Sequence, residues 1–206
     1  MGFKRTVSIL VFIVFIIISV LSILKSSDTV TKEQSGEPVV LTETETEEET
    51  VIPEDIFERY PLIVVAAGII LTAAVLLMKD SGRMAFLIIY LLFIVSMTLA
   101  FREMGYSRGR LEIFWSYKQF FTSDRIRLEI LNNIWLFVPL GAVLYSPGHK
   151  FTWIYAVLLS VWIELIQYET GLGLCEVDDV ISNTLGTLIG YSVSFGMMST
   201  GNSTKS

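Results

Sequence analysis

The sequence is poor in the residues that cross-link or metallate small domains. Its 206 residues include one cysteine, Cys175, and one histidine, His149. A single thiol excludes an intramolecular disulfide, and no set of thiolate and imidazole ligands exists for a structural zinc site. Basic residues are also in the minority, with 15 Lys and Arg against 21 Asp and Glu and a net charge of −6. This balance argues against a nucleic-acid binder, which needs a broad cationic face. We expect no metal and no cofactor.

Charge is nearly absent from six long stretches, and apolar residues fill them. The mean hydropathy is +0.61, and 52% of residues are hydrophobic, against roughly 45 to 50% in soluble domains. About 20 residues of helix cross a hydrocarbon core about 30 Å thick. We therefore predict an all-α fold, a polytopic membrane helix bundle with six transmembrane helices. The stretches are 18 or 19 residues long and cover 7–24, 61–78, 84–101, 130–148, 151–168 and 180–198.

The first stretch has two interpretations, a permanent anchor or a cleaved signal peptide. It is longer than the roughly 7 to 15 residues of a signal core, which favours an uncleaved anchor; cleavage would leave five spans. After it, 25–60 carries eleven acidic and three basic residues, a net charge of −8. Such self-repulsion predicts a flexible tether. The predicted organisation is an anchor (1–24), an acidic disordered linker (25–60), a transmembrane domain (61–198) and a disordered C-terminal tail (199–206).

The charges between the spans predict a cytoplasmic N-terminus. Lys4 and Arg5 precede the first span and the acidic run follows it, as the positive-inside rule requires. The loop 102–129 conflicts with the positive-inside rule, because it carries six basic residues and this topology places it outside. It also holds Trp115 and Tyr117 among other aromatics, which suits the headgroup zone of a bilayer. Either these residues form a plain aromatic belt with snorkelling cations, or Arg125 and Arg127 bind an anionic headgroup.

Polar residues inside the last three spans are the candidate functional residues, because a charged group in a bilayer is expensive unless it has a partner or faces a wet cavity. Ser160, Glu164 and Gln167 share one helical face, and so do Asp179, Asn183, Gly186 and Gly190. Gly186 and Gly190 form a small-xxx-small pattern that allows close helix packing. Asp178 and Asp179 stand where a helix begins, so helix capping alone is a competing explanation for them.

These residues are expected at one depth, near the outer leaflet beside the basic aromatic loop. Asn133 begins the fourth span, whose Pro139 should kink that helix or open its hydrogen bonds, with Gly141 close by. Arg125 or Arg127 would neutralise Glu164 or Asp179 by a bidentate pair. Two readings stay open: a ligand site, or interhelical polar contacts that only hold the bundle together.

Three segments in this order and spacing, NNIWLFVPLGAVL, IELIQ and EVDDVISNTLGTLIGY, resemble the VanZ-like membrane proteins. The resemblance covers about 111–191 and includes LEIFWSY. Many relatives carry an arginine shortly before the aspartate pair, where this chain has Leu174 and Cys175, so a role for that arginine does not carry over. The residues at the family's signature positions are Asn133, Phe137, Pro139, Gly141, Glu164, Gln167, Asp178, Asp179, Asn183, Gly186 and Gly190.

The resemblance implies a multi-pass protein of the bacterial cytoplasmic membrane that influences the cell envelope or susceptibility to glycopeptides such as teicoplanin. We expect a non-enzymatic protein whose outer-leaflet polar pocket binds an anionic amphiphile. The partners expected are membrane lipid, a lipid-linked cell-wall intermediate or a lipoglycopeptide; the oligomeric state is not predicted. The alternative is a membrane enzyme in which Asp178, Asp179 and Glu164 hold Mg²⁺ and act on a lipid-linked phosphate.

Overall fold

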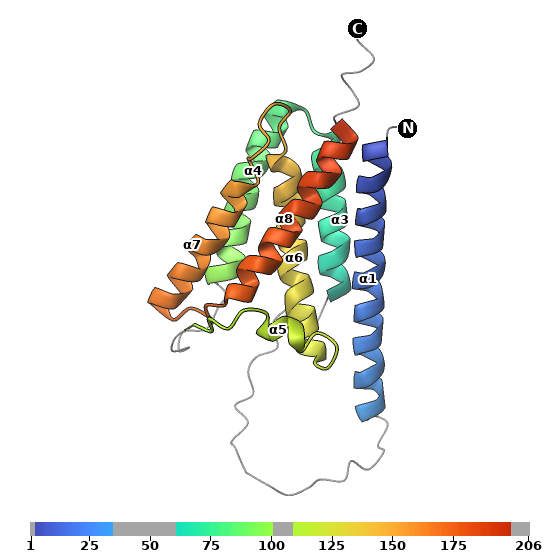
Figure 1. Cartoon of the computed structure of the whole chain (residues 1–206), viewed down its shortest axis with the longest axis vertical. Coiled ribbons are helices and arrows are strands. Elements are labelled where there is room, and N and C mark those ends of the chain that lie inside the picture. Colours follow the sequence, from blue (N-terminus) through green and yellow to red (C-terminus); the bar gives the residue numbers. More distant parts are fainter. Residues whose placement is uncertain (1–2, 35–60, 101–108, 199–206) are drawn as a thin grey trace, which may run out of the picture.

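The computed structural model describes residues 3–34, 61–100 and 109–198, and within them the chain is a helical bundle without strands (Figure 1). The helices are α1 (Phe3–Gln34), α3 (Pro61–Leu77), α4 (Asp80–Val95) with the π-helical turn η1 (Ser96–Ala100), the short α5 (Trp115–Lys118), α6 (Asp124–Leu144), α7 (Ile154–Thr170) and α8 (Val177–Met198). The predicted all-α bundle is confirmed. Helix α1 continues ten residues past Leu24, into the predicted linker. The rest of that linker, the predicted tail and residues 101–108 of the basic loop lie outside the described residues.

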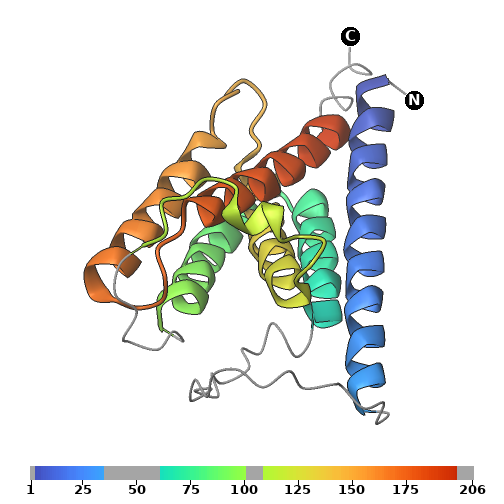
Figure 2. The same cartoon turned by 60° about the horizontal axis from the view of Figure 1, so that its bottom comes forward.

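Helices α6 and α8 form the centre of the bundle and cross each other closely (Figures 1 and 2). Trp135, Phe137 and Val138 of α6 are at most 1% exposed. Glycines allow the approach. A Cβ added to Gly186 would collide with the backbone of Ile134, and one added to Gly190 would collide with the carbonyl oxygen of Val138. Gly141 of α6 meets the backbone of α8 at Thr187 in the same way. The small-xxx-small pattern of α8 therefore has α6 as its partner, across an interface of backbone against backbone.

The other helices pack around this pair. In Figure 1, α1 and α3 lie on one side of α6, and α4 and α7 lie on the other. Phe12 and Phe15 of α1 pack against the ring of Trp135, whose indole N–H donates to the Ser19 hydroxyl at 3.0 Å. Helix α6 runs on through Pro139 as one helix. One turn earlier, the Leu136 carbonyl accepts a hydrogen bond from the Tyr90 hydroxyl at 2.9 Å, which ties α4 to this part of α6.

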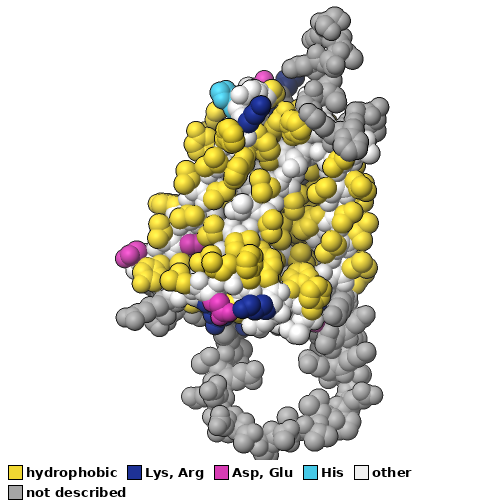
Figure 3. All heavy atoms as spheres, viewed as in Figure 1, with side chains coloured by type: hydrophobic (Ala, Val, Ile, Leu, Met, Phe, Trp, Pro, Cys, Tyr) yellow, Lys and Arg dark blue, Asp and Glu magenta, His cyan; other side chains and the backbone are white. Residues whose placement is uncertain are grey.

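The sides of the bundle are apolar and its charges gather at the two ends (Figure 3). Large side chains face outward along the outer helices, including Leu10, Ile63, Ile89 and Leu165, each at least 56% exposed. Three helical segments are long and apolar enough to cross a membrane: Thr6–Leu24, Asp80–Leu99 and Asp124–Leu144. Leu62–Leu77 is apolar but shorter. These features fit a membrane protein, while the predicted number of six spans is not confirmed.

Arg83 closes the end of the bundle opposite α5. Its guanidinium Nη2 donates to the carbonyl oxygens of Ala142, Val143 and Tyr145 at 3.1, 3.0 and 2.9 Å. The last carbonyls of a helix have no intrahelical partner and carry its negative dipole end, so a cation there satisfies and neutralises them together. Arg83 of α4 thus caps α6 from a neighbouring helix.

An Arg83→Met variant should lower the free energy of unfolding by about 2 kcal/mol, because three carbonyls lose a charged donor while the apolar stem is kept. Thermal unfolding of the purified protein in detergent, followed by far-UV circular dichroism, measures the change. The exposed Lys79, one turn earlier, provides the matched control, Lys79→Met. Equal melting temperatures for the two variants would contradict the capping role of Arg83.

Candidate functional site

Polar side chains from three helices and a connecting loop meet in the part of the bundle that carries α5. They lie in the middle of α6, from the middle to the last turn of α7, and in the first two turns of α8 (Figures 1 and 2). We call this group the polar end cluster; its members are Asn133, Ser160, Glu164, Gln167, Glu176, Asp178, Asp179 and Asn183. Six of the polar residues predicted to share one depth lie here: Asn133, Glu164, Gln167, Asp178, Asp179 and Asn183. Which side of the membrane this end faces stays a prediction.

Asp178 holds the short helix α5 against α8. It is 1% exposed, and its carboxylate accepts hydrogen bonds from the backbone N–H of Phe114 at 2.6 Å, and from the N–H and hydroxyl of Ser116 at 2.9 and 2.7 Å. Phe114 has a left-handed backbone, with φ of 63°, a conformation that a residue with a Cβ adopts only when its surroundings impose it. Asp178 therefore caps α5 across the bundle, which is more than the local helix capping that its sequence position suggested.

Asp179 and Asn183 make the next contacts along α8. The Asn133 amide of α6 donates to the Asp179 carboxylate at 2.7 Å, and the Asn183 amide donates to the Ser160 hydroxyl of α7 at 2.8 Å. Neighbouring residues of the aspartate pair thus face different partners, α5 for Asp178 and α6 for Asp179. The cluster joins all three long helices of this end.

Glu164 and Gln167 connect α7 to the surrounding loops. Glu164 is 6% exposed and accepts from the backbone N–H of Glu176 at 2.7 Å, so it holds the segment 171–176 in place. The Gln167 amide donates to the Thr98 carbonyl at 3.1 Å, in the π-helical turn η1. A π-turn exposes carbonyls that a regular helix would use itself. The amide oxygens of Gln167 and Asn183 accept no hydrogen bond from the described part of the chain.

Arg110 is the residue at this end of the bundle that sequence reasoning missed. Its backbone N–H donates to the Cys175 carbonyl at 2.7 Å, and its own carbonyl accepts from Val177, which forms an isolated parallel bridge between Arg110 and Glu176. Its guanidinium lies 3.8 Å from the centre of the Trp115 ring. Among the described residues it has no ion pair or hydrogen bond to a side chain. No local pattern in the sequence signals a bridge between segments 66 residues apart.

Gly109 allows that bridge to form, because a Cβ there would come within 2.6 Å of the Cys175 carbonyl oxygen and 3.1 Å of its sulfur. The bridge brings the Arg110 cation next to Glu176, which precedes the aspartate pair by two residues. Trp115 contributes a second feature: its indole N–H is shielded from solvent and has no acceptor within the described chain. Arg110, whose guanidinium has no side-chain hydrogen bond or ion pair among the described residues, therefore lies in direct contact with Trp115, whose indole N–H has no acceptor there.

Electrostatics at this end centre on Glu176, which is half-buried beside the bridge. Burial raises the pKa of Glu176 to about 7; the Asp179 carboxylate adds to the rise, and Arg110 opposes it. Burial also raises the pKa of the Cys175 thiol, with the Glu164 carboxylate adding to that rise, so this thiol is a weak nucleophile.

The predicted partners of two arginines are wrong. Arg127 is 2% exposed and pairs with Asp124, while also donating to the carbonyls of Phe120 and Ser22. Arg125 pairs with Glu129 at 3.2 Å. Residues three or four apart on a helix are neighbours on its surface, so these acids of α6 satisfy the arginines locally. Within the described chain, neither pairs with Glu164 or Asp179. Arg127 serves to tie α1 and the loop before α6 to the base of α6.

The remaining predicted residues divide into contact and packing positions. Tyr117 forms a hydrogen bond with the Ser182 hydroxyl at 2.8 Å, so it fixes α5 to α8. Pro139, Gly141, Gly186 and Gly190 lie along the α6–α8 crossing and not among the carboxylates. They position the cluster without entering it.

The carboxylates of the catalytic alternative do not form a metal site. No group of three or more His, Cys, Asp or Glu side chains in the described chain is placed to hold a metal ion. Asp178 is turned to α5, Asp179 to Asn133 and Glu164 to the segment 171–176. Their oxygens accept from protein donors, so this arrangement favours structural use over Mg²⁺ binding.

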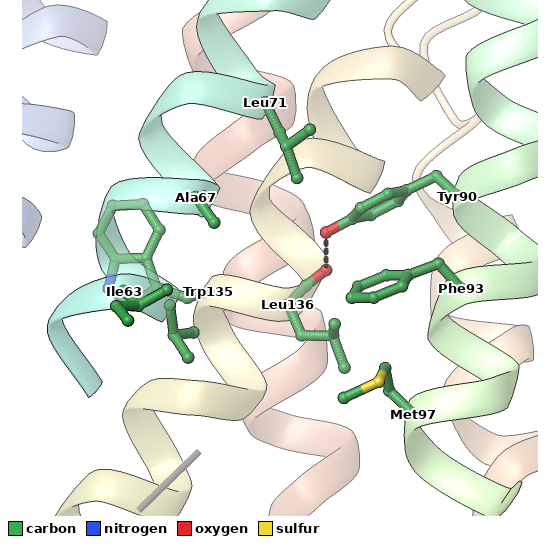
Figure 4. Close-up of a pocket in the computed structure, with 10 residues that line it drawn as sticks. Ile63, Ala67, Leu71, Tyr90, Phe93, Met97, Trp135 and Leu136 are labelled. Atoms are coloured by element: carbon green, nitrogen blue, oxygen red, sulfur yellow. Dashed lines mark hydrogen bonds between the residues drawn. The ribbon is translucent and has the colours of Figure 1, made fainter. Parts of the chain in front are cut away.

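Two apolar hollows lie elsewhere in the bundle. One, of about 260 Å³, opens between α3, α4 and α6, and Figure 4 shows Ile63, Ala67, Tyr90, Phe93 and Met97 around it. Another, of about 460 Å³, lies between α4, α6 and α7. No residue of the polar end cluster lines either hollow.

The sequence matches a known protein family. The family described as VanZ/LLP1 matches residues 86–198, more than half of the chain, from α4 to the end of α8. This chain belongs to the VanZ/LLP1 family. The family segment contains the whole polar end cluster and the α6–α8 crossing, whereas α1 and α3 precede it.

Among curated proteins, a relative named Protein VanZ from Enterococcus faecium is 29% identical over 77 residues. The similar stretch covers 35% of this chain and 48% of that protein, so it spans about half of the relative's length. No solved structure matches the chain. The VanZ/LLP1 assignment therefore rests on sequence similarity. The polar end cluster and the α6–α8 crossing are the arrangement of the signature residues in this family member.

Proposed function

We propose that this VanZ/LLP1 protein is a non-enzymatic membrane protein that binds an anionic amphiphile at its α5 end. The observation that carries the proposal is the Arg110 guanidinium, which is stacked on Trp115 at 3.8 Å and has no side-chain hydrogen bond or ion pair within the described chain. A guanidinium held in place by an aromatic ring keeps its planar donors available for a phosphate or carboxylate. The indole N–H of Trp115 adds a donor that lacks an acceptor.

The composition of the α5 end supports an interfacial site. Phe114 and Phe121 are 53% and 78% exposed beside it, and exposed rings next to cations are typical of segments that lie at a membrane surface. The headgroup would meet Arg110 and Trp115 at the rim, while the chain of the amphiphile stays in the bilayer. Glu164 supports the site indirectly, because it holds the segment 171–176 to which Arg110 is bridged.

We place this end in the outer leaflet of a bacterial cytoplasmic membrane. Helix α1 begins at the opposite end of the bundle, with Lys4 and Arg5 in its first turn, and the α3–α4 connection with Lys79 lies at that opposite end as well (Figure 1). Positive residues favour the cytoplasmic side, which supports a cytoplasmic N-terminus and an outward α5 end. From there a bound lipid, lipid-linked cell-wall intermediate or lipoglycopeptide would affect the envelope, and we propose altered teicoplanin susceptibility as the cellular consequence.

An Arg110→Gln variant should bind phosphatidylglycerol about tenfold more weakly, because the headgroup loses a charge-assisted donor. Binding is measured by native mass spectrometry of the detergent-solubilised full chain, with phosphatidylcholine as the zwitterionic comparison. Lys118→Gln is the matched control: Lys118 is an exposed cation on α5 that pairs with Glu112. An equal loss in both variants would show diffuse attraction to positive charge and would contradict a site at Arg110.

A further inference from the structure

Resting on the function proposed above, we propose that Glu176 acts as a proton-controlled competitor of the anionic headgroup for Arg110. As a carboxylate, Glu176 offsets the charge of Arg110 and repels the headgroup. Once protonated, it leaves the guanidinium to the headgroup. The site then binds anionic amphiphiles more tightly in mild acid than in mild base.

The backbone holds the two side chains together. Residues facing each other across a β-bridge project their side chains on the same side, and Arg110 and Glu176 form such a bridge. Its hydrogen bonds are Arg110 N–H to the Cys175 carbonyl at 2.7 Å and Val177 N–H to the Arg110 carbonyl at 3.4 Å. The Glu176 N–H is itself fixed by the Glu164 carboxylate. Glu176 is therefore anchored beside Arg110 whatever its protonation state.

Charged groups face Glu176 from each element packed against it. Asp178 and Asp179 lie on α8, Glu129 on α6 and Arg110 on the bridging segment, and all four influence its titration. Glu164 of α7 contacts its backbone. Burial, together with the carboxylates of Asp179, Glu129 and Asp178 against the one cation Arg110, raises the pKa of Glu176 to about 7. A carboxylate in this position changes its charge near neutral pH, where an exposed glutamate would stay ionised.

The sign of the effect follows from linkage. Below the pKa of Glu176 the neutral carboxyl neither neutralises Arg110 nor repels an anion, so affinity is high. Above it the carboxylate does both, so affinity falls. A headgroup bound at Arg110 adds negative charge near Glu176 and raises its pKa further, so binding takes up a proton and each event favours the other.

The test measures phosphatidylglycerol binding to the full chain at about pH 6 and about pH 8, using a short-chain lipid in detergent. A phosphodiester keeps one negative charge throughout this range, so a change in affinity belongs to the protein. For the natural sequence we expect affinity to fall about fivefold between the two values, as one nearby charge is worth about 1 kcal/mol. Glu176→Gln should bind with the higher affinity at both, and Glu176→Asp should keep the fall.

The matched control is Glu112→Gln, which removes an exposed carboxylate near α5 and should leave the pH dependence intact. If Glu176→Gln still loses affinity with rising pH, the proton-control proposal is overturned while the binding function stands. If Arg110→Gln binds as the natural sequence does at both pH values, the proposed function itself fails. Glycerophosphoglycerol, the same headgroup without chains, separates recognition of a free phosphodiester from that of a lipid. The proposal requires the same pH dependence for whichever of the two binds.

Discussion

A Gly190→Ala variant should lose the native packing of α8 on α6 and fail to accumulate as folded protein. Its new methyl carbon would lie 1.8 Å from the Val138 carbonyl oxygen and 2.8 Å from the Ala142 backbone nitrogen, far inside van der Waals contact. Both obstacles are backbone atoms of a buried helix, so no rotamer change relieves the clash, and the helices must move apart. We expect a loss of about 3 kcal/mol or more in the free energy of unfolding. Abundance in membrane extracts and the melting temperature in detergent measure it.

Gly82→Ala is the matched control for this substitution. Gly82 lies in the first turn of α4, and an added Cβ would find its nearest neighbour, the Met78 side chain, at 3.9 Å. Alanine favours helix over glycine by about 1 kcal/mol, so this variant should be as stable as the natural sequence or slightly more so. Normal abundance of Gly190→Ala would mean that α6 and α8 do not approach as closely as described.

Gly186 and Gly190 show which part of the helix packing can be predicted from the sequence. The spacing of Gly186 and Gly190 predicts a close helix contact, because small residues four apart line one face. It does not name the partner. That partner is α6, whose carbonyls at Ile134 and Val138 carry no sequence signal, since every residue has a carbonyl. Local pattern specifies the face that packs, whereas the identity of the packing partner depends on the whole bundle.

For the polar end cluster too, the sequence predicts some features and leaves others undetermined. Hydropathy places Asn133, Glu164 and Asp179 at similar depths, because Asn133 and Glu164 lie a few residues inside an apolar stretch and Asp179 lies just before one. The structure brings them together. Helical spacing predicts which residues share a face, and Ser160 and Asn183 do meet across α7 and α8. The ligand-binding role of these residues stays a prediction.

The cation partners could not be predicted, because they depend on contacts distant in sequence. The charge-rich loop suggested Arg125 and Arg127, whose acidic neighbours three and four residues away on α6 take them instead. Arg110 reaches the cluster through a bridge to Glu176 that needs Gly109 at its centre. In the sequence, Gly109 and Arg110 cannot be distinguished from other loop residues. Their importance depends on the bridge to Glu176, which only the fold forms.

Asp178 and Asp179 are adjacent in the sequence but have different structural roles. Asp178 accepts three hydrogen bonds from the start of α5 and is 1% exposed. Asp179 accepts a hydrogen bond from the Asn133 amide and is less deeply buried. Loss of the first carboxylate leaves two backbone donors and a hydroxyl in a dry environment, which costs far more than the hydrogen bonds themselves contribute. The two positions should therefore respond differently to the same substitution.

Asp178→Ala should cost about 3 to 5 kcal/mol and release α5 from the bundle, because no nearby group replaces the lost acceptors. The stability loss is measured by thermal unfolding in detergent. Release of α5 is measured by hydrogen exchange, where the amides of Phe114 and Ser116 should lose their protection. Asp80→Ala, which removes an exposed aspartate from the first turn of α4, is the control and should change stability by less than about 1 kcal/mol.

Asp178→Asn tests charge separately from acceptor count. An asparagine keeps one oxygen acceptor but turns an N–H₂ toward donors, so part of the stability should return and the left-handed turn at Phe114 should remain the weak point. Because α5 carries Trp115, any variant that frees it should also weaken anionic lipid binding, even though Asp178 touches no headgroup. If Asp178→Ala kept both α5 protection and lipid affinity, α5 would be held by its contact between Tyr117 and Ser182, and Asp178 would be dispensable.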